Sequence, residues 1–109
     1  MHYGNEEMVF VLSGEGTLRF GNKVFPITAG DFIACPRGPE HSHQIINTSD
    51  QDITYLCVSA MEKPEVFIYP DSEKFSVFTS SATGGPKEKR TFSIFSRQTG
   101  AVDYWGGEN

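Results

Sequence analysis

The sequence predicts a single all-β domain. Short runs of β-branched and aromatic residues alternate with turns, and the 109-residue chain carries 11 Gly and 6 Pro. In the first part of the chain the turns recur about every eight to ten residues, a spacing typical of a sandwich or barrel. No stretch shows the periodicity of an amphipathic helix. The apolar fraction of 38% is sufficient for a globular core.

The first part of the chain predicts six strands. The continuously apolar run Met8–Leu12 predicts a buried strand, and the turn that follows it is rich in glycine. Pro36 ends the fourth strand because proline has no amide hydrogen to donate to a ladder. We expect the fifth and sixth strands to pair across the polar turn at residues 49–52. The predicted strands are Met8–Leu12, Thr17–Phe20, Val24–Ile27, Phe32–Cys35, His43–Thr48 and Ile53–Ser59.

The character of the chain changes after Ser59, where Pro64 interrupts the strand pattern. We therefore divide the chain into a barrel core at residues 1–60 and a C-terminal extension at residues 61–109. The extension predicts a loop around residues 83–90 and an aromatic tail, Ala101–Trp105, that docks on the barrel or on a partner subunit. Its predicted strands are Glu65–Pro70, Lys74–Thr79 and Thr91–Ser96.

Composition excludes several classes of function. The formal net charge of -5 argues against a general nucleic-acid binder, which needs a basic face. No apolar stretch approaches the roughly 20 residues of a membrane span, and no signal-type leader is visible, so we expect a cytoplasmic protein without membrane contact. Cys35 and Cys57 lie in apolar runs, which predicts two free, buried thiols. Neither a nucleophile elbow nor a phosphate-binding glycine loop is present.

The stretch Gly30–Asn47 carries the residues with the clearest chemical meaning. A glycine turn opens it, an apolar strand follows, and a Pro-Arg-Gly-Pro loop leads to His41 and His43. Imidazoles at the mouth of a strand, with a carboxylate available from elsewhere in the chain, suit a small divalent metal site. On a strand that begins at Glu7, residues 7, 9 and 11 share one face, so this carboxylate would point inward with Val9 and Val11.

Residues 2–60 resemble the cupin superfamily, in particular its small single-domain bacterial members. The first motif of that family is matched by Glu7, with four residues between it and His2 and six between it and Gly14. The second motif is matched from Gly30 to Asn47, although the gap before His43 is four residues, longer than is usual. Paired motifs at this separation are a specific signal. The matching positions are His2, Glu7, Gly14, Gly30, Pro36, Gly38, His43 and Asn47.

The resemblance implies a double-stranded β-helix, or jelly-roll barrel, with a metal site at one end. Carried over position by position, the metal ligands are His2, Glu7 and His43. The implied cofactor is a divalent transition metal: Mn, Fe, Ni, Co or Zn. The family's remaining histidine would lie two residues before His2, ahead of Met1, so we expect either that the natural start lies upstream or that the site has three residues at best. We also expect an N-terminal strand that is missing or exchanged with a second subunit. A homodimer is the expected assembly.

Each candidate ligand has a purely structural alternative. His2 could be a frayed, solvent-exposed residue near the chain terminus. Glu7 could be an exposed carboxylate at the start of a strand, and His43 a hydrogen-bonded histidine at the barrel mouth. His41 competes with His43 because residues two apart on an extended chain face the same way. We rank His43 first because its spacing to Asn47 also matches, and we expect Asn47 to stabilise a turn.

Two functions from different classes follow from the resemblance. The first is a metal-dependent enzyme of the isomerase, dioxygenase or decarboxylase type, acting on a small polar substrate. The second is a non-catalytic domain that binds or senses a small molecule with an incomplete metal site. Fold and family alone do not choose between them, because this scaffold supports many activities.

Overall fold

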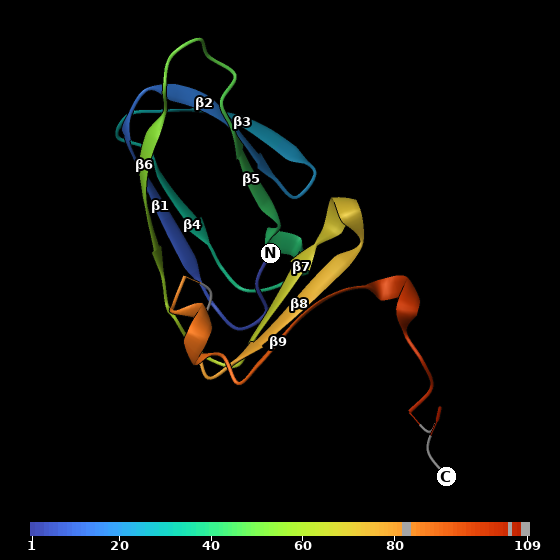
Figure 1. Cartoon of the computed structure of the whole chain (residues 1–109). Coiled ribbons are helices and arrows are strands. Elements are labelled where there is room, and N and C mark those ends of the chain that lie inside the picture. The colour runs from blue at the N-terminus through green and yellow to red at the C-terminus, as the bar shows by residue number, and fades with distance from the viewer. Residues whose placement is uncertain (82–83, 105, 108–109) are drawn as a thin grey trace.

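The computed structural model describes residues 1–81, 84–104 and 106–107. Its described part contains nine strands and four short 3-10 segments (Figure 1). The strands pair antiparallel and form three three-stranded sheets, in the orders β4-β1-β6, β3-β2-β5 and β7-β8-β9. The strands are β1 (Glu7–Ser13), β2 (Glu15–Phe20), β3 (Lys23–Thr28), β4 (Phe32–Cys35), β5 (His43–Ile46), β6 (Thr54–Ser59), β7 (Glu65–Tyr69), β8 (Lys74–Thr79) and β9 (Phe92–Arg97).

The first two sheets face each other and enclose the core, which gives the predicted jelly-roll architecture (Figure 1). Side chains alternate along each strand, so Val9 and Val11 of β1 point inward while Met8 and Phe10 point outward. The outward residues remain about half exposed, so the prediction that Met8–Leu12 is buried throughout is wrong. The buried core consists of Val9, Val11, Leu18, Ile27, Ile33 and Cys35.

Strand pairing differs from the prediction at one place. β5 pairs with β2 and β6 pairs with β1, so the two strands belong to opposite sheets rather than to one hairpin. The connecting loop is held by Asn47, whose side-chain oxygen accepts hydrogen bonds from Ser49 and whose amide donates to the Gln51 carbonyl. Asn47 therefore stabilises a turn, as expected, but this turn carries the chain across the sandwich.

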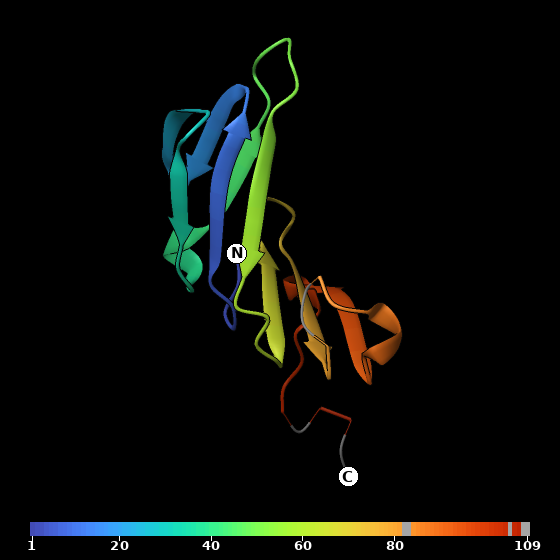
Figure 2. The same cartoon turned by 90° about the vertical axis from the view of Figure 1, so that its left-hand side faces the viewer.

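The third sheet lies beyond one end of the sandwich (Figure 2). The N-terminal residues connect it to the sandwich by pairing with β7. The Tyr3 amide donates to the Val66 carbonyl at 2.9 Å, and Ile68 and Met1 exchange hydrogen bonds at 2.9 and 2.8 Å. The segment that contains His2 is thereby held against β7 along its backbone.

The predictions for the two cysteines and for the C-terminal tail can be compared with the described residues. Cys35 and Cys57 are both free thiols, but only Cys35 is buried, and Cys57 is exposed. Val102 and Tyr104 of the tail are each 82% exposed, and Trp105 lies outside the described residues. Residue 83 of the predicted loop also lies outside them. Within the described ranges, the structure contains no helix with the length and apolar character needed to cross a membrane.

Candidate functional site

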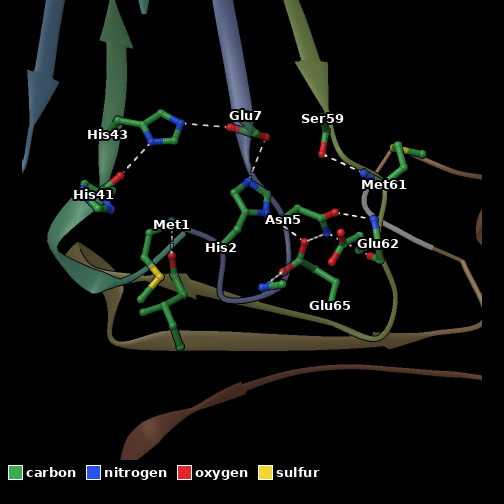
Figure 3. Close-up of polar contacts among 12 residues, drawn as sticks. Met1, His2, Asn5, Glu7, His41, His43, Ser59, Met61, Glu62 and Glu65 are labelled. Carbon is green, nitrogen blue, oxygen red and sulfur yellow. Dashed lines mark hydrogen bonds and ion pairs between the residues drawn. The ribbon is translucent and has the colours of Figure 1, made fainter. Parts of the chain in front are cut away.

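Three of the predicted residues meet at the end of the sandwich that faces the third sheet. Glu7 begins β1 and His43 begins β5, so the two side chains come from opposing sheets. The Oε1 atom of Glu7 lies 2.8 Å from His2 Nε2, and its Oε2 atom lies 3.0 Å from His43 Nε2 (Figure 3). One carboxylate therefore contacts the Nε2 atoms of two imidazoles.

His2 is held firmly although it is the second residue of the chain. It is only 5% exposed, and its ring packs edge-on against Phe67 with the ring centroids 4.1 Å apart. The bridge between His2 and Phe67 places it on the flank of β7. The alternative of a frayed, solvent-exposed residue is therefore wrong.

Two buried residues that sequence reasoning missed support His2 from behind. Glu65, the first residue of β7, is 0% exposed, and its Oε2 atom lies 3.2 Å from His2 Nδ1. Its carboxylate also accepts hydrogen bonds from the Gly4 amide, at 3.0 Å, and from the side chain of Asn5, which is 1% exposed. The available sequence signal was an acidic residue at the head of the apolar run EVFIY, directly after Pro64.

His43 is oriented by its own loop. Its Nδ1 atom lies 2.9 Å from the carbonyl oxygen of His41, and its ring stacks near Phe20 with the centroids 6.3 Å apart. The His41 ring instead contacts the Arg37 carbonyl through Nδ1 at 2.7 Å. The structure thus brings His43, and not His41, to Glu7.

The close contacts change the acid–base behaviour of the cluster. Interactions with Cys35 and with the Glu7 carboxylate raise the pKa of His43 to about 10. Hydrogen bonds from His2 and His43 hold the pKa of Glu7 well below its ordinary value, against the opposing effect of burial. At neutral pH Glu7 and His43 therefore form a carboxylate–imidazolium pair, and the proton on His43 Nε2 occupies a position that a cation could take.

A cavity of about 370 Å³ opens beside these residues. Its walls come from both parts of the chain, because the 3-10 segment Pro70–Ser72 after β7 lies across from the ends of β2 and β5. Arg19 of β2 pairs with Asp71 at the rim. The lining includes His2, Glu7, Arg19, His43, Phe67 and Asp71.

The three side chains are of the types that bind a divalent transition metal. In this structure, however, their donor atoms contact one another. Among the described residues, no group of three or more His, Cys, Asp or Glu side chains is arranged to hold a metal ion. Instead, both Nε2 atoms contact Glu7 directly. Both Nδ1 atoms, however, face oxygen atoms, which favours a hydrogen on Nδ1 and leaves Nε2 as the atom that can give up its proton to a cation. Two such imidazoles and a carboxylate are suitable ligands once the cation replaces the protons between them.

The jelly-roll fold with two histidines and a glutamate at its mouth places this chain in a recognised class. Residues 1–59 match the Cupin_2 family, described as a cupin domain, and the chain belongs to this family. The match ends with β6, so β7, β8 and β9 lie outside it. Glu65 and Phe67, which contact His2, are therefore not part of the matched segment.

Two curated proteins are similar to the first half of the chain. One is the uncharacterized protein MJ1618 of Methanocaldococcus jannaschii, 34% identical over 58 residues, or 53% of this chain and 45% of that protein. The other is the oxalate-binding protein of Thermotoga maritima, 39% identical over 57 residues, or 52% of this chain and 46% of that protein. The matched stretch thus spans slightly under half the length of these relatives.

Two solved structures are similar over most of the chain. A candidate sugar phosphate isomerase from Acidithiobacillus ferrooxidans aligns with a TM-score of 0.76 at 26% identity. A sugar phosphate isomerase of the cupin superfamily from Silicibacter pomeroyi aligns with a TM-score of 0.75 at 25% identity. Each alignment covers 94% of this chain and 59% of the solved chain, so the likeness extends to the third sheet.

Proposed function

We propose that this cupin domain binds a divalent transition metal through His2, Glu7 and His43, and binds a small polar molecule in the adjacent cavity. The observation that carries the proposal is the orientation of the two imidazoles. Each has its Nδ1 atom engaged with an oxygen acceptor and its Nε2 atom directed at the same carboxylate. Ligating histidines are commonly held in this way, with the second ring nitrogen donating to a carboxylate or a backbone carbonyl.

The residues of the site have distinct roles in this proposal. His2 and His43 offer Nε2 lone pairs once a cation displaces the protons there, and Glu7 offers a negative charge that attracts the cation. When bound, a divalent cation supplies Lewis-acid polarisation of a ligand oxygen. Arg19 and Asp71 at the rim provide a cationic and an anionic contact for a polar molecule in the cavity.

Catalysis on such a molecule is a second candidate function. The solved structures that align over 94% of the chain are sugar phosphate isomerases, at 25–26% identity. The second curated relative is named an oxalate-binding protein, and this name favours the binding of a small anion without chemistry. Both sources support a small polar ligand. They differ on whether the bound molecule is converted.

The metal proposal is tested by comparing two neighbouring histidines. We expect the purified protein to bind one Zn²⁺ or Ni²⁺ per chain in isothermal titration calorimetry. We expect His43→Ala to weaken this binding at least about 100-fold, since a direct ligand is lost. His41→Ala is the matched control and should leave the affinity unchanged, because His41 faces the Arg37 carbonyl. Binding that is insensitive to His43→Ala, or lost equally in both variants, would contradict the proposal.

We also propose that the chain forms a homodimer through the outer face of the β4-β1-β6 sheet. Met8 and Phe10 of β1 lie opposite Val58 and Leu56 of β6, and Phe10 lies opposite Phe32 of β4, so these side chains share one face. An antiparallel sheet with one face in solvent is expected to carry polar residues there. This face instead carries six large apolar side chains that are 41–62% exposed: Met8, Phe10, Leu12, Phe32, Leu56 and Val58.

The size of this apolar face supports a second copy as its partner. At half exposure the six side chains offer roughly 600 Å² per subunit, and two copies would bury about 1,200 Å², the lower end for a specific stable interface. An apolar face is also complementary to itself across a twofold axis. The radius of gyration of 16.4 Å exceeds the roughly 13 Å of a compact domain of this length, so the isolated chain leaves much surface unburied.

Light scattering after size exclusion tests the assembly. We expect the wild-type chain to have the mass of a dimer and Phe32→Glu to have that of a monomer. Val24→Glu is the control, because Val24 is 66% exposed on the other sheet of the sandwich. A wild-type monomer, or a dimer that survives Phe32→Glu, would contradict this interface.

A further inference from the structure

The buried pair Asn5 and Glu65 lies behind His2, on the side opposite to Glu7 (Figure 3). Both side chains are essentially inaccessible, at 1% and 0% exposure. A buried carboxylate is costly unless it is fully hydrogen-bonded, so its partners are informative about the direction of each hydrogen bond.

The orientation of the Asn5 amide is set by the backbone of Glu62. The Glu62 amide N–H can only donate, and it contacts Asn5 Oδ1. The Asn5 Nδ2 group then faces the other way, where it donates to the Glu62 carbonyl at 3.0 Å and to Glu65 Oε2. A backbone donor thus fixes which end of the amide faces the carboxylate.

The carboxylate of Glu65 consequently acts only as an acceptor. Its Oε1 atom receives the Gly4 N–H at 3.0 Å, and its Oε2 atom receives the Asn5 amide. Because the same Oε2 atom lies 3.2 Å from His2 Nδ1, the imidazole must donate there. With a hydrogen held on Nδ1, Nε2 is the atom that can give up its proton to a cation, and Nε2 is the atom that faces Glu7 and the cavity.

We propose that Asn5 and Glu65 are positioning residues that hold the His2 ring with a hydrogen on Nδ1, donated to Glu65. The chain of hydrogen bonds runs from the Glu62 backbone through Asn5 and Glu65 to the ring, and each link has its direction set by the one before it. As a result, His2 presents Nε2 to the site. This inference rests on the proposed metal site for its functional meaning, but the hydrogen on Nδ1 is itself a property of the metal-free protein.

Glu65→Gln is the sharpest change, because it keeps the shape of the side chain. Three donors converge on Glu65, and a carboxamide has only one acceptor oxygen to offer them. Whichever way the new carboxamide turns, its own N–H group meets at least one of these donors. In either orientation the ring loses its charged acceptor, because Nδ1 then faces either an N–H group or a neutral amide oxygen, which is a weaker acceptor than a carboxylate.

Two measurements test the proposal. Long-range ¹H–¹⁵N NMR of the metal-free wild type at about pH 8, where a free imidazole is neutral, should show His2 with its Nδ1 protonated. In Glu65→Gln, Nδ1 should shift toward the unprotonated position, and Zn²⁺ affinity should fall about 10- to 100-fold. Glu6→Gln is the matched control, since Glu6 is 62% exposed, and it should change neither quantity.

The outcomes separate this inference from the proposed function. An unprotonated Nδ1 in the metal-free wild type would overturn the positioning role without the need for any variant. Equal Zn²⁺ affinity in Glu65→Gln and wild type would also overturn it. If the wild type binds no metal, the proposed function fails, while a protonated Nδ1 that is lost in Glu65→Gln would still establish the role of Glu65 in setting the tautomer.

Discussion

The two parts of this chain contribute to the site in different ways. Residues 1–59, which match the cupin family, carry the three candidate donors His2, Glu7 and His43. The third sheet, outside the matched segment, contributes Glu65 and Phe67, which hold the His2 ring from two sides. The family motifs therefore indicate which atoms could bind a metal, whereas the third sheet determines how one of the three is presented. Substitutions in the two parts should differ accordingly.

The largest effect is expected in the matched segment, at Glu7. Glu7→Gln removes the negative charge between the two Nε2 atoms while keeping the size of the side chain. We expect the affinity for Zn²⁺ to fall at least about 100-fold, because a charged ligand is replaced by a neutral amide. Calorimetric titration measures this. An affinity within twofold of the wild type would remove Glu7 from the site and with it the contrast between the two parts.

A smaller and mixed effect is expected in the third sheet, at Phe67. Phe67→Ala removes the ring that packs on His2 at a centroid distance of 4.1 Å. Because Phe67 is only partly buried, we expect a loss of about 2 kcal/mol in the free energy of unfolding, below the usual cost for a fully buried phenylalanine. We also expect Zn²⁺ to bind about tenfold more weakly, since the His2 ring is less constrained. Urea denaturation and calorimetry measure the two quantities. Unchanged metal binding would indicate that the third sheet does not orient His2.

Opposite pH dependences are expected for stability and for metal binding. The pKa of His43 is raised from 6.5 to about 10 in the folded, metal-free protein. Its contribution to stability is therefore full below about pH 6.5 and is lost as the pH rises through about 10. Metal binding must displace the same proton, so the affinity should increase over this range. Denaturation and titration at several pH values check both slopes, and His43→Ala should flatten the first. A stability that rises between pH 7 and 10 would contradict the assigned ion pair.

The smallest effect is expected at the rim. The Arg19–Asp71 pair joins β2 to the segment after β7, but the two side chains are 42% and 70% exposed. Arg19→Ala should therefore change the free energy of unfolding by less than about 1 kcal/mol. Thermal denaturation measures this. A larger loss would mean that this contact is a main attachment between the two parts.

Much of the architecture could be predicted from the sequence, because the signals are local. Alternating apolar residues and glycine turns locate the nine strands of the described part within about two residues, and Phe32–Cys35 and Lys74–Thr79 coincide with β4 and β8. Pairing is not a local property, which is why the expectation of a hairpin between β5 and β6 is wrong. Their polar connection resembles a tight turn, but it carries the chain between sheets.

The site could be predicted only in part, for a similar reason. The motif spacings singled out Glu7 and His43, and the structure places them in contact. The supports of His2 could not be predicted, because Asn5 and Glu65 are 60 residues apart in sequence and no periodicity connects them. Glu65 is a charged residue in an apolar strand, and only its three hydrogen-bond donors explain its burial.

X-ray absorption spectroscopy of the zinc- or nickel-loaded protein tests the central claim most directly. The account predicts multiple-scattering features of two imidazole ligands in the wild type and in His41→Ala, and of one imidazole in His43→Ala. A metal without imidazole scattering, or a spectrum that changes in His41→Ala but not in His43→Ala, would contradict it.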